Sequence, residues 1–314
     1  MTGRSLTPNE LLRELDPFVA KAYDRHVEQA VAWFPHEYVP YERGRNFIDE
    51  PWKPEDSRLP DIAQIAIELN LLTEDNLPYY TVALTETFGK TEAWGEWVRR
   101  WTAEEGRHAI VLRDYLTVTR GVDPAAMETG RMDMVQRGWY PGFVEAGPVD
   151  GVIYTTLQEL ATRISHRNTG TVTQDEGALK ILQRIATDEN LHYLFYREMA
   201  EEVLKIDPST AMLAIRRQAK SFAMPGADMP GFRHKAKVMA EAGVYNFRIH
   251  HDQILVPVLL KHWKIDQIEG LTDEAKRARD EVLAHMVKLD RVASKLDELG
   301  APVEARRVDP TSLA

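Results

Sequence analysis

Two glutamate–histidine pairs with identical spacing are the residues of this sequence best suited to chemistry. Glu105 lies three positions before His108, and Glu189 lies three positions before His192. Residues three apart on a helix share a face, so each pair can direct a carboxylate and an imidazole towards one point. Spacing alone leaves two readings open, because such pairs also occur as solvated surface residues.

The wider layout favours a metal site. Glu74 and Glu159 each lie about 30 residues before one of the pairs, on the preceding expected helix. An antiparallel four-helix bundle would bring these helices around one axis, so that four carboxylates and two imidazoles converge. Two divalent ions would balance the four carboxylates, which are otherwise costly to bury. Oxygen and nitrogen donors without sulfur favour iron or manganese over a structural zinc.

Glu74 fits this set least well. We expect it at the start of a helix, after Thr73, where an acid also interacts favourably with the helix dipole. Pro78 confines it to the first turn or to a kink. A capping role is therefore the alternative for Glu74.

The other histidines are expected to have no ligand role. His166 lies two turns beyond Glu159 on the same helix face, and we expect it to pack in the core rather than to support the site. Surface or core positions are expected for His250, His251, His262 and His285.

The composition excludes several classes of function. The 314-residue chain is 44% hydrophobic and carries a formal net charge of -10, with scattered Lys and Arg, so nucleic acid is not an expected partner. It contains no cysteine, which excludes disulfides and thiolate-bound metals. The longest apolar run, 254–260, is too short for a membrane span, and no secretory signal is visible. We expect a cytoplasmic protein.

Apolar residues recur at helical spacing along almost the whole chain, which predicts an all-α protein. The expected helices are 7–32, 60–71, 74–89, 91–121, 149–171, 174–205, 208–221, 232–243, 245–263 and 272–299. Proline-rich segments at 34–59 and 222–231 are expected to be ordered loops. We interpret 1–314 as one domain, with a core over about 50–225 and a C-terminal helical extension over about 232–300.

The sequence resembles the soluble acyl-acyl-carrier-protein desaturases of bacterial type, a ferritin-like di-iron family. The resemblance extends from about residue 50 to 225 and is carried by "EPWKPED", "TEDNLPYY", "WTAEEGRH", "QELATRISHRNTG", "TDENLH" and the "AMP" at 223–225. It implies a ferritin-like antiparallel four-helix bundle with additional N- and C-terminal helices, and a homodimer. The chain differs from the plant enzymes in the compressed segment "TETFGKTEA" and in Asn190-Leu191 inside the second motif.

The resemblance also implies roles for the site residues. Glu74 and His108 would be terminal ligands of one iron, Glu159 and His192 of the other, with Glu105 and Glu189 bridging the two. Thr162 would lie on the oxygen-binding side. Trp52 and Asp188 would connect a ligand histidine to the surface as an electron path. Independently, Asp188 and Glu104 are each placed to accept a hydrogen bond from the histidine of the opposite motif, as carboxylates behind metal-bound histidines commonly do.

The implied activity is O2-dependent desaturation of an acyl chain on acyl carrier protein, with electrons from a ferredoxin-type donor. An acidic carrier needs a basic docking patch. Two patches are candidates: Arg99 and Arg100 with Arg216, Arg217 and Lys220, or Arg233 with Lys235 and Lys237. Two alternatives remain open: a di-iron oxygenase or hydroxylase of another substrate, and a catalytically inactive metal- or acyl-carrier-binding relative.

Overall fold

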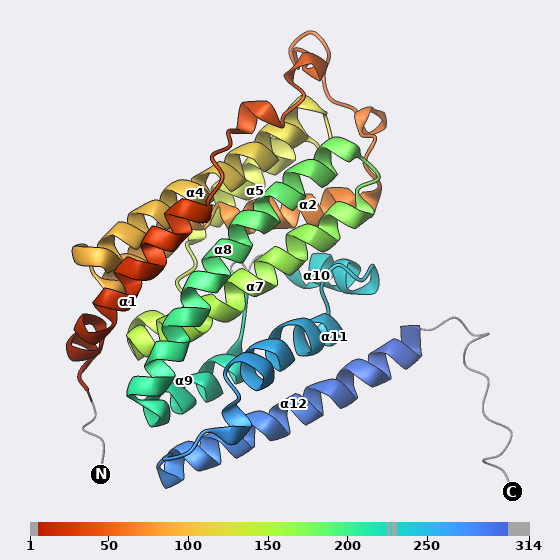
Figure 1. Cartoon of the computed structure of the whole chain (residues 1–314). Helices are drawn as coiled ribbons and strands as arrows, with labels where there is room; N and C mark the ends of the chain where they lie inside the picture. Colours follow the sequence, from red (N-terminus) through yellow and green to blue (C-terminus); the bar gives the residue numbers. More distant parts are fainter. Residues whose placement is uncertain (1–5, 225–226, 228–230, 301–314) are drawn as a thin grey trace, which may run out of the picture.

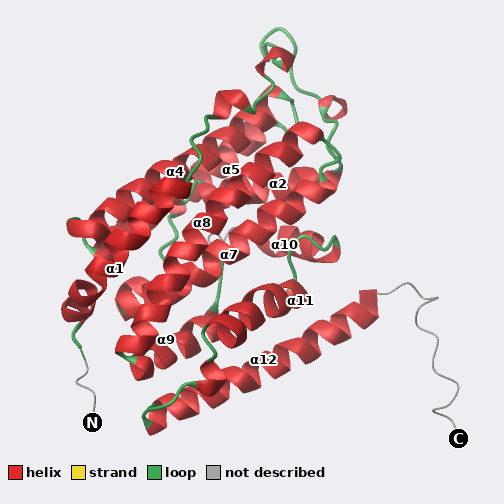
Figure 2. Ribbon diagram, viewed as in Figure 1, coloured by secondary structure: helices red, strands yellow, loops and turns green. Residues whose placement is uncertain are grey.

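The computed structural model describes residues 6–224, 227 and 231–300. Within these residues every regular element is a helix, which confirms the expected all-α class (Figure 2). The expected loop at 222–231 lies largely outside the described residues, and so does Pro225 of the "AMP" motif.

Most helices follow one another along the chain with short connections, but residues 30–60 form a long one between the first two helices (Figure 1). The first half contains α1 (Pro8–Gln29), α2 (Asp61–Glu74), α3 (Leu77–Phe88), α4 (Glu92–Val118), α5 (Pro124–Arg137) and α6 (Phe143–Ala146). The second half contains α7 (Pro148–Val172), α8 (Glu176–Ile206), α9 (Pro208–Ser221), α10 (Phe232–Glu241), α11 (Phe247–Ile249) and α12 (Asp273–Gly300). Short 3-10 turns occur at Pro35–Glu37, Tyr41–Arg43, Pro54–Asp56 and Ile265–Gln267.

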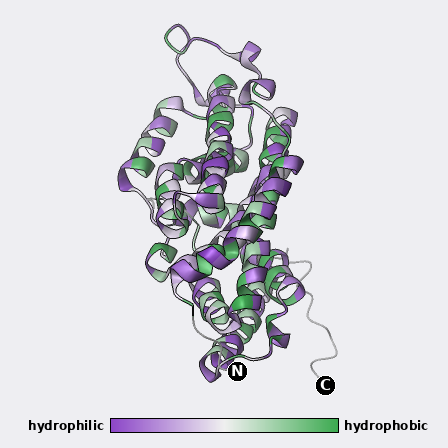
Figure 3. Cartoon of the chain, turned by 60° about the vertical axis from the view of Figure 1, so that its left-hand side comes forward, coloured by the Kyte–Doolittle hydropathy of each residue, from purple (hydrophilic) through white to green (hydrophobic). Residues whose placement is uncertain are grey.

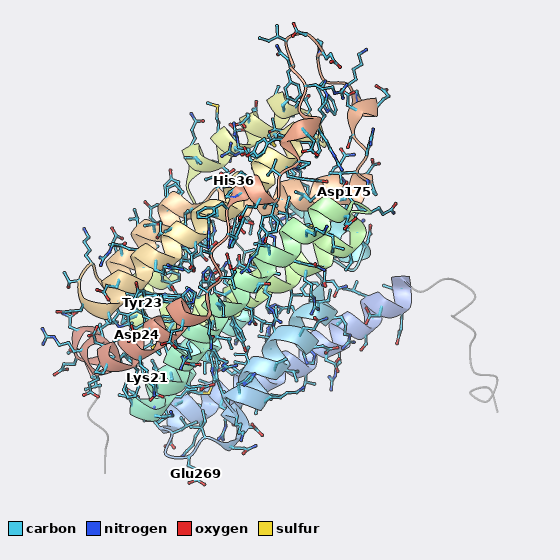
Figure 4. All side chains as sticks on the ribbon, turned by 45° about the horizontal axis from the view of Figure 1, so that its top comes forward. Lys21, Tyr23, Asp24, His36, Asp175 and Glu269 are labelled. Carbon is cyan, nitrogen blue, oxygen red and sulfur yellow. The ribbon has the colours of Figure 1, made fainter. Side chains whose placement is uncertain are left out.

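The central bundle is formed by α7 and α8, which pack along their length, together with α4 and the α2–α3 pair. α1 packs against α4 and α8, while α9 and α12 pack on the other side (Figure 1). In α1, Lys21 and Asp24 are exposed (Figure 4), whereas the stripe that contains Leu15, Val19 and His26 is buried. Hydrophobic and hydrophilic residues accordingly alternate along the helices (Figure 3).

α7 is buried along most of its length, although it carries many polar residues. Its threonines satisfy their hydroxyl groups within the helix: Thr155 donates to the carbonyl of Gly151 and Thr156 to that of Val152, both at 2.7 Å. Because these groups are satisfied locally, they can be buried at little cost. The other buried polar side chains of α7 include Glu159, Thr162 and His166, the residues that the sequence analysis considered for the site.

Three elements differ from the expectation, and one of them is α6, a four-residue helix that was not predicted. α5 was not predicted, because its buried apolar residues are few, Met127 and Met134, and its periodicity is weak. The helix expected at 245–263 is a short α-helix, Phe247–Ile249, followed by a π-helix, His250–His262. Pro257 lies inside this π-helix and cannot donate a backbone hydrogen bond, so regular α-helical bonding is interrupted there.

No helix of the described residues combines the length and the apolarity that crossing a membrane requires.

Candidate metal centre

The two glutamate–histidine pairs lie on the inner faces of α4 and α8. Glu105 and His108 come from the middle of α4, and Glu189 and His192 from the middle of α8. Both histidines are completely buried, and both glutamates are buried. The pairs are therefore not solvated surface residues, which removes the alternative that spacing left open.

The six expected side chains form two overlapping groups, each compact enough to hold one ion. One group contains Glu74, Glu105, His108 and Glu189, and the other contains Glu105, Glu159, Glu189 and His192. In each group the candidate ligand atoms lie within 4.8 Å of one another. Glu105 and Glu189 belong to both groups, so they lie between the two positions.

Each histidine directs one nitrogen into the cluster. Nδ1 of His108 lies 3.1 Å from Glu105 Oε2, 3.4 Å from Glu189 Oε1 and 3.7 Å from Glu74 Oε2. Nδ1 of His192 lies 2.8 Å from Glu105 Oε1 and 3.8 Å from Glu159 Oε2. The two halves of the site thus repeat one geometry, with Nδ1 inward and Nε2 outward.

The donor atoms inside the cluster fit a pair of metal ions. Both oxygens of Glu189, Oε2 of Glu159, Oε1 of Glu105 and Nδ1 of His192 are buried, and none makes a hydrogen bond of acceptable geometry, although Glu105 Oε1 and His192 Nδ1 lie 2.8 Å apart. Buried polar atoms in native proteins are almost always paired, so five unpaired atoms around one point indicate a cation. The donors are oxygen and imidazole nitrogen, which iron and manganese accept.

Electrostatics in the metal-free protein leads to the same conclusion. Burial raises the pKa of Glu189, with a further contribution from Glu105, and burial also raises the pKa of Glu159. Burial opposes protonation of His108, but the carboxylates of Glu105, Asp188 and Glu189 together outweigh it and raise the pKa of His108. Without cations, the cluster therefore retains protons in place of metal.

Glu74 reaches the cluster from a different place than expected. It is the last residue of α2, not the first turn of the next helix, so a role as an N-terminal capping acid is wrong. Its neighbour Asp75 accepts two hydrogen bonds from Arg131 of the unpredicted α5, at 2.5 and 2.9 Å. The turn that carries Glu74 is therefore held by α5.

His166 contacts the cluster rather than only packing in the core. Its Nε2 lies 2.9 Å from Glu74 Oε1 and 4.0 Å from Glu189 Oε1, and the residue is fully buried. The expectation that it serves mainly in packing is wrong. His166 supports the carboxylate of Glu74 from behind.

Asp188 lies behind His108, as expected, but its tryptophan partner is not Trp52. Oδ2 of Asp188 lies 3.4 Å from His108 Nε2 and accepts a 2.7 Å hydrogen bond from Trp33 Nε1. The Trp33 ring lies nearly parallel to that of His108, with centroids 6.3 Å apart. Trp52 instead donates to the carbonyl of Arg120 at 3.1 Å, beyond the end of α4. The chain between α1 and α2, marked by His36 in Figure 4, brings Trp33 to this position.

Glu104 lies behind His192 in the equivalent position, with a partner that sequence reasoning missed. Its Oε2 lies 3.0 Å from His192 Nε2 and 2.8 Å from His26 Nε2, while Oε1 accepts from Arg100 Nε at 2.6 Å. Burial works against ionisation, but the hydrogen bonds from His192 and His26 lower the pKa of Glu104. The available signal was a histidine on the apolar stripe of α1, which includes Leu15.

Glu159 and Thr162, both on α7, face the same space. Oε1 of Glu159 accepts a 3.0 Å hydrogen bond from Trp101 Nε1, a contact that the sequence did not reveal. The Thr162 hydroxyl donates to the Gln158 carbonyl at 2.8 Å and accepts from Gln158 Nε2 at 2.9 Å. Thr162 thus borders the cluster, while its hydroxyl is already engaged within α7.

Two neighbouring cavities lie on one side of the cluster. A cavity of about 30 Å³ is lined by Thr73, Glu74, Leu77, Tyr80, Trp101, Glu105, Gln158, Thr162, Glu189 and Met224. A neighbouring cavity of about 70 Å³ is lined by Leu69, Asn70, Thr73, Thr162, Ser165, Met224, Phe232, Ala236, Met239 and Tyr245. They share Thr73, Thr162 and Met224, so they lie next to each other between α10 and the carboxylates.

Comparisons with known proteins agree with this arrangement. A family model described as "Fatty acid desaturase" matches residues 7–309. The chain is 44% identical to the Mycobacterium tuberculosis protein assigned as acyl-acyl-carrier-protein desaturase DesA1, over 93% of this chain and 89% of that protein. It is 32% identical to the chloroplastic stearoyl-acyl-carrier-protein 9-desaturase 1 of Oryza sativa, over 88% of this chain and 77% of the relative.

The fold has a counterpart among solved structures. The X-ray structure of the Mycobacterium tuberculosis protein assigned as acyl-ACP desaturase DesA2 matches with a TM-score of 0.66 and 30% sequence identity. The match covers 82% of this chain and 98% of the solved one.

Proposed function

Since the chain belongs to the fatty acid desaturase family and is an acyl-acyl-carrier-protein desaturase, we propose that it acts through a pair of iron ions, O2 and electrons from a ferredoxin-type donor. The observation that carries the proposal is the pair of ion-sized groups that share Glu105 and Glu189. The relatives are named acyl-acyl-carrier-protein desaturases, so the substrate class is an acyl chain bound to acyl carrier protein.

The proposed ligands are assigned to two ions according to the two groups of side chains described above. Glu74 and His108 would serve one ion, Glu159 and His192 the other, and Glu105 and Glu189 both. The iron pair would activate O2, which with two electrons from the donor is reduced to water and takes up the two hydrogens removed from the saturated chain; no titratable side chain can do this. Manganese fits the same donors and is the alternative metal.

The protein's own residues would prepare the site. Asp188 and Glu104 accept hydrogen bonds from the two ligand histidines and fix their orientation, with Nδ1 directed inward. His166 and Trp101 donate hydrogen bonds to the carboxylates of Glu74 and Glu159 and fix the orientation of these two side chains. The apolar cavities would align the acyl chain and exclude water, and we propose that Thr162 borders the oxygen side.

Electrons would enter along His108, Asp188 and Trp33. The guanidinium group of Arg107 lies 4.8 Å from the Trp33 ring centre, and its side chain remains 20% exposed. These residues thus form a contact chain from a proposed ligand towards the surface. We therefore propose Trp33, in place of Trp52, for the role in the electron path that the resemblance implies.

The carrier protein would dock beside α10. Both candidate patches are largely ion-paired: Arg217 pairs with Asp150 and Lys220 with Glu281 in one, and Lys235 pairs with Glu68 and Lys237 with Glu241 in the other. The position of α10 beside the outer cavity, rather than its charge, therefore favours it. Arg233 of α10 is exposed and has no ion pair within the described residues. α10 also supplies Phe232 and Ala236 to the outer cavity, so an acyl chain delivered there has a direct route inward. A homodimer, which the resemblance implies, stays a prediction.

Product analysis tests the proposal. The iron-loaded protein is incubated with saturated acyl carrier protein, O2 and reduced ferredoxin, and the released acyl chains are identified by mass spectrometry. We expect a new double bond, which Glu105→Ala and Glu189→Ala abolish. Glu96→Ala is the matched control, because Glu96 is on the exposed face of the same α4 helix. A hydroxylated product would indicate an oxygenase, and full iron content without any O2-dependent turnover would indicate an inactive relative.

A further inference from the structure

The layer of side chains behind the two proposed histidine ligands has the same plan on both halves of the cluster. On the first half, Trp33 donates to the carboxylate behind His108, and the two rings lie nearly parallel. On the second half, His26 Nε2 lies 2.8 Å from Glu104 Oε2. The His26 ring is stacked on that of His192, with centroids 5.7 Å and planes 23° apart. His26 thus occupies behind one proposed ligand the position that Trp33 occupies behind the other.

The packing of α1 fixes His26 in this position. His26 is the last residue of the buried stripe of α1 and is itself buried. The preceding residue, Arg25, pairs with Glu198 of α8, so this end of α1 is held against the helix that carries His192. The ring of Trp97 meets His26 at right angles, with centroids 5.0 Å apart. The His26 ring therefore has little freedom to leave the carboxylate that it faces.

The carboxylate of Glu104 is held at both of its oxygens. Oε1 accepts from Arg100 Nε at 2.6 Å, while Oε2 faces Nε2 of His26 and, at 3.0 Å, Nε2 of His192. An ionised carboxylate only accepts hydrogen bonds, so both histidines donate through Nε2. His192 then has its lone pair on Nδ1, the atom that faces the cluster. Nδ1 of His26 has no hydrogen-bond partner within the described residues, which agrees with a proton on its Nε2.

We infer that His26 is a positioning residue of the metal centre: it holds Glu104, and Glu104 in turn fixes the tautomer and the direction of His192. This inference rests on the proposed function, in which His192 is a ligand of one ion. Without His26, the carboxylate of Glu104 depends on Arg100, whose side chain is 36% exposed. An exposed, flexible partner positions a carboxylate less well than a buried ring, so His192 loses part of its orientation. The N-terminal helix thereby contributes to a site whose proposed ligands lie on other helices.

The test measures iron affinity by anaerobic titration of ferrous iron in competition with a chelator. His26→Phe keeps a ring against Trp97 and His192 but removes the donor to Glu104. Loss of the partner behind a metal-bound histidine costs about 10–100-fold in affinity, and because Glu104 itself remains we expect about tenfold for one of the two ions. His26→Gln restores an N–H donor of similar reach and should recover most of the affinity.

A double-mutant cycle tests whether His26 acts through Glu104. In a Glu104→Gln background, His26→Phe should cost no further affinity, because the carboxylate that His26 holds is already gone. His250→Phe is the matched control, because His250 also stacks on an aromatic ring, that of Phe222, and has no contact with a proposed ligand within the described residues. It should bind iron as the wild type does.

Urea unfolding verifies that each variant is folded, and His26→Leu replaces the phenylalanine variant if that protein does not fold. Wild-type iron affinity in folded His26→Phe or His26→Leu overturns the inference. The same holds if His26→Gln binds iron as weakly as His26→Phe, or if His26→Phe costs as much in the Glu104→Gln background as in the wild type. A wild type that binds no iron would refute the proposed function, and the inference with it.

Discussion

Replacing Asp188 by asparagine removes a charge behind a proposed ligand while keeping the side-chain shape. Asp188 accepts hydrogen bonds from His108 Nε2 and Trp33 Nε1, and it pairs with Arg107 and Arg184. An asparagine has one acceptor oxygen for these four donors, so at least one partner must lose its hydrogen bond. His108 should therefore be less well oriented, and its Nδ1 should be a weaker electron donor to a metal ion.

The size of the effect follows from the position of Asp188. Loss of the partner behind a metal-bound histidine typically costs about 10–100-fold in metal affinity, which is about 1.4–2.8 kcal/mol. Arg107 and Arg184 also lose their counterion, with side chains 20% and 12% exposed. Breaking a buried ion pair costs up to about 3–5 kcal/mol of unfolding free energy, and the partial exposure of both arginines reduces that cost.

A competition titration of iron against a chelator measures the affinity, and urea unfolding measures the stability. Asp56→Asn is the matched control, because Asp56 accepts from Arg120 Nε at 2.9 Å and touches no proposed ligand. Both variants should lose stability, but only Asp188→Asn should lose iron affinity. Wild-type iron affinity in a destabilised Asp188→Asn protein would refute the reasoning.

Three further predictions follow from individual contacts. Trp33→Phe removes the donor to Asp188 and should lower ferredoxin-supported turnover about 10–100-fold with unchanged iron content. Trp52→Phe should leave this turnover unchanged, because Trp52 donates to the backbone of Arg120. The reverse result would restore Trp52 to the electron path. Burial lowers the pKa of His250 to about 4, so its contribution to stability is lost as pH falls from about 6.5 towards 4. Between pH 7 and 5 the wild type should therefore lose about 2 kcal/mol more unfolding free energy than His250→Gln, and equal losses in urea titrations would contradict this. Because the pKa values of His108 and Glu189 are raised in the metal-free protein, iron binding should release protons and weaken as pH falls. Calorimetry in buffers of different ionisation enthalpy detects the release, and buffer-independent heats would argue against it.

The core of the site could be predicted because its spacing follows helix geometry. Glu105 and His108 lie one turn apart whatever surrounds them, and the same holds for Glu189 and His192. The repeated order of elements then indicates the bundle, and the bundle brings the helices together. Local periodicity was enough for these steps.

The parts that could not be predicted depend on contacts between distant segments. Trp33 is 155 positions from Asp188, and the sequence holds nothing that links the two. Trp52 lies in a motif that resembles the family, but its indole meets the backbone of Arg120. The placement of Glu74 failed for a different reason: helix ends are uncertain by a few residues, and here that uncertainty decides which helix carries the residue.

His26 shows a signal that was present but not used. It occupies a position on the buried stripe of α1 where an apolar residue would be expected, together with Leu15 and Val19. A titratable residue on an apolar stripe needs a partner, and Glu104 is that partner. Polar residues at core positions of helices outside the central bundle therefore merit the same attention as the motif residues.

The most direct measurement is the iron content and Mössbauer spectrum of the purified protein, compared with Glu105→Ala and Glu189→Ala. If these two carboxylates lie between two ions, the wild type should hold two irons per chain as a coupled pair. Each variant should lose that coupling and at least one iron, while Glu96→Ala keeps both. Two irons retained as a coupled pair by Glu105→Ala and Glu189→Ala, or a wild type that binds no more than one, would contradict the account.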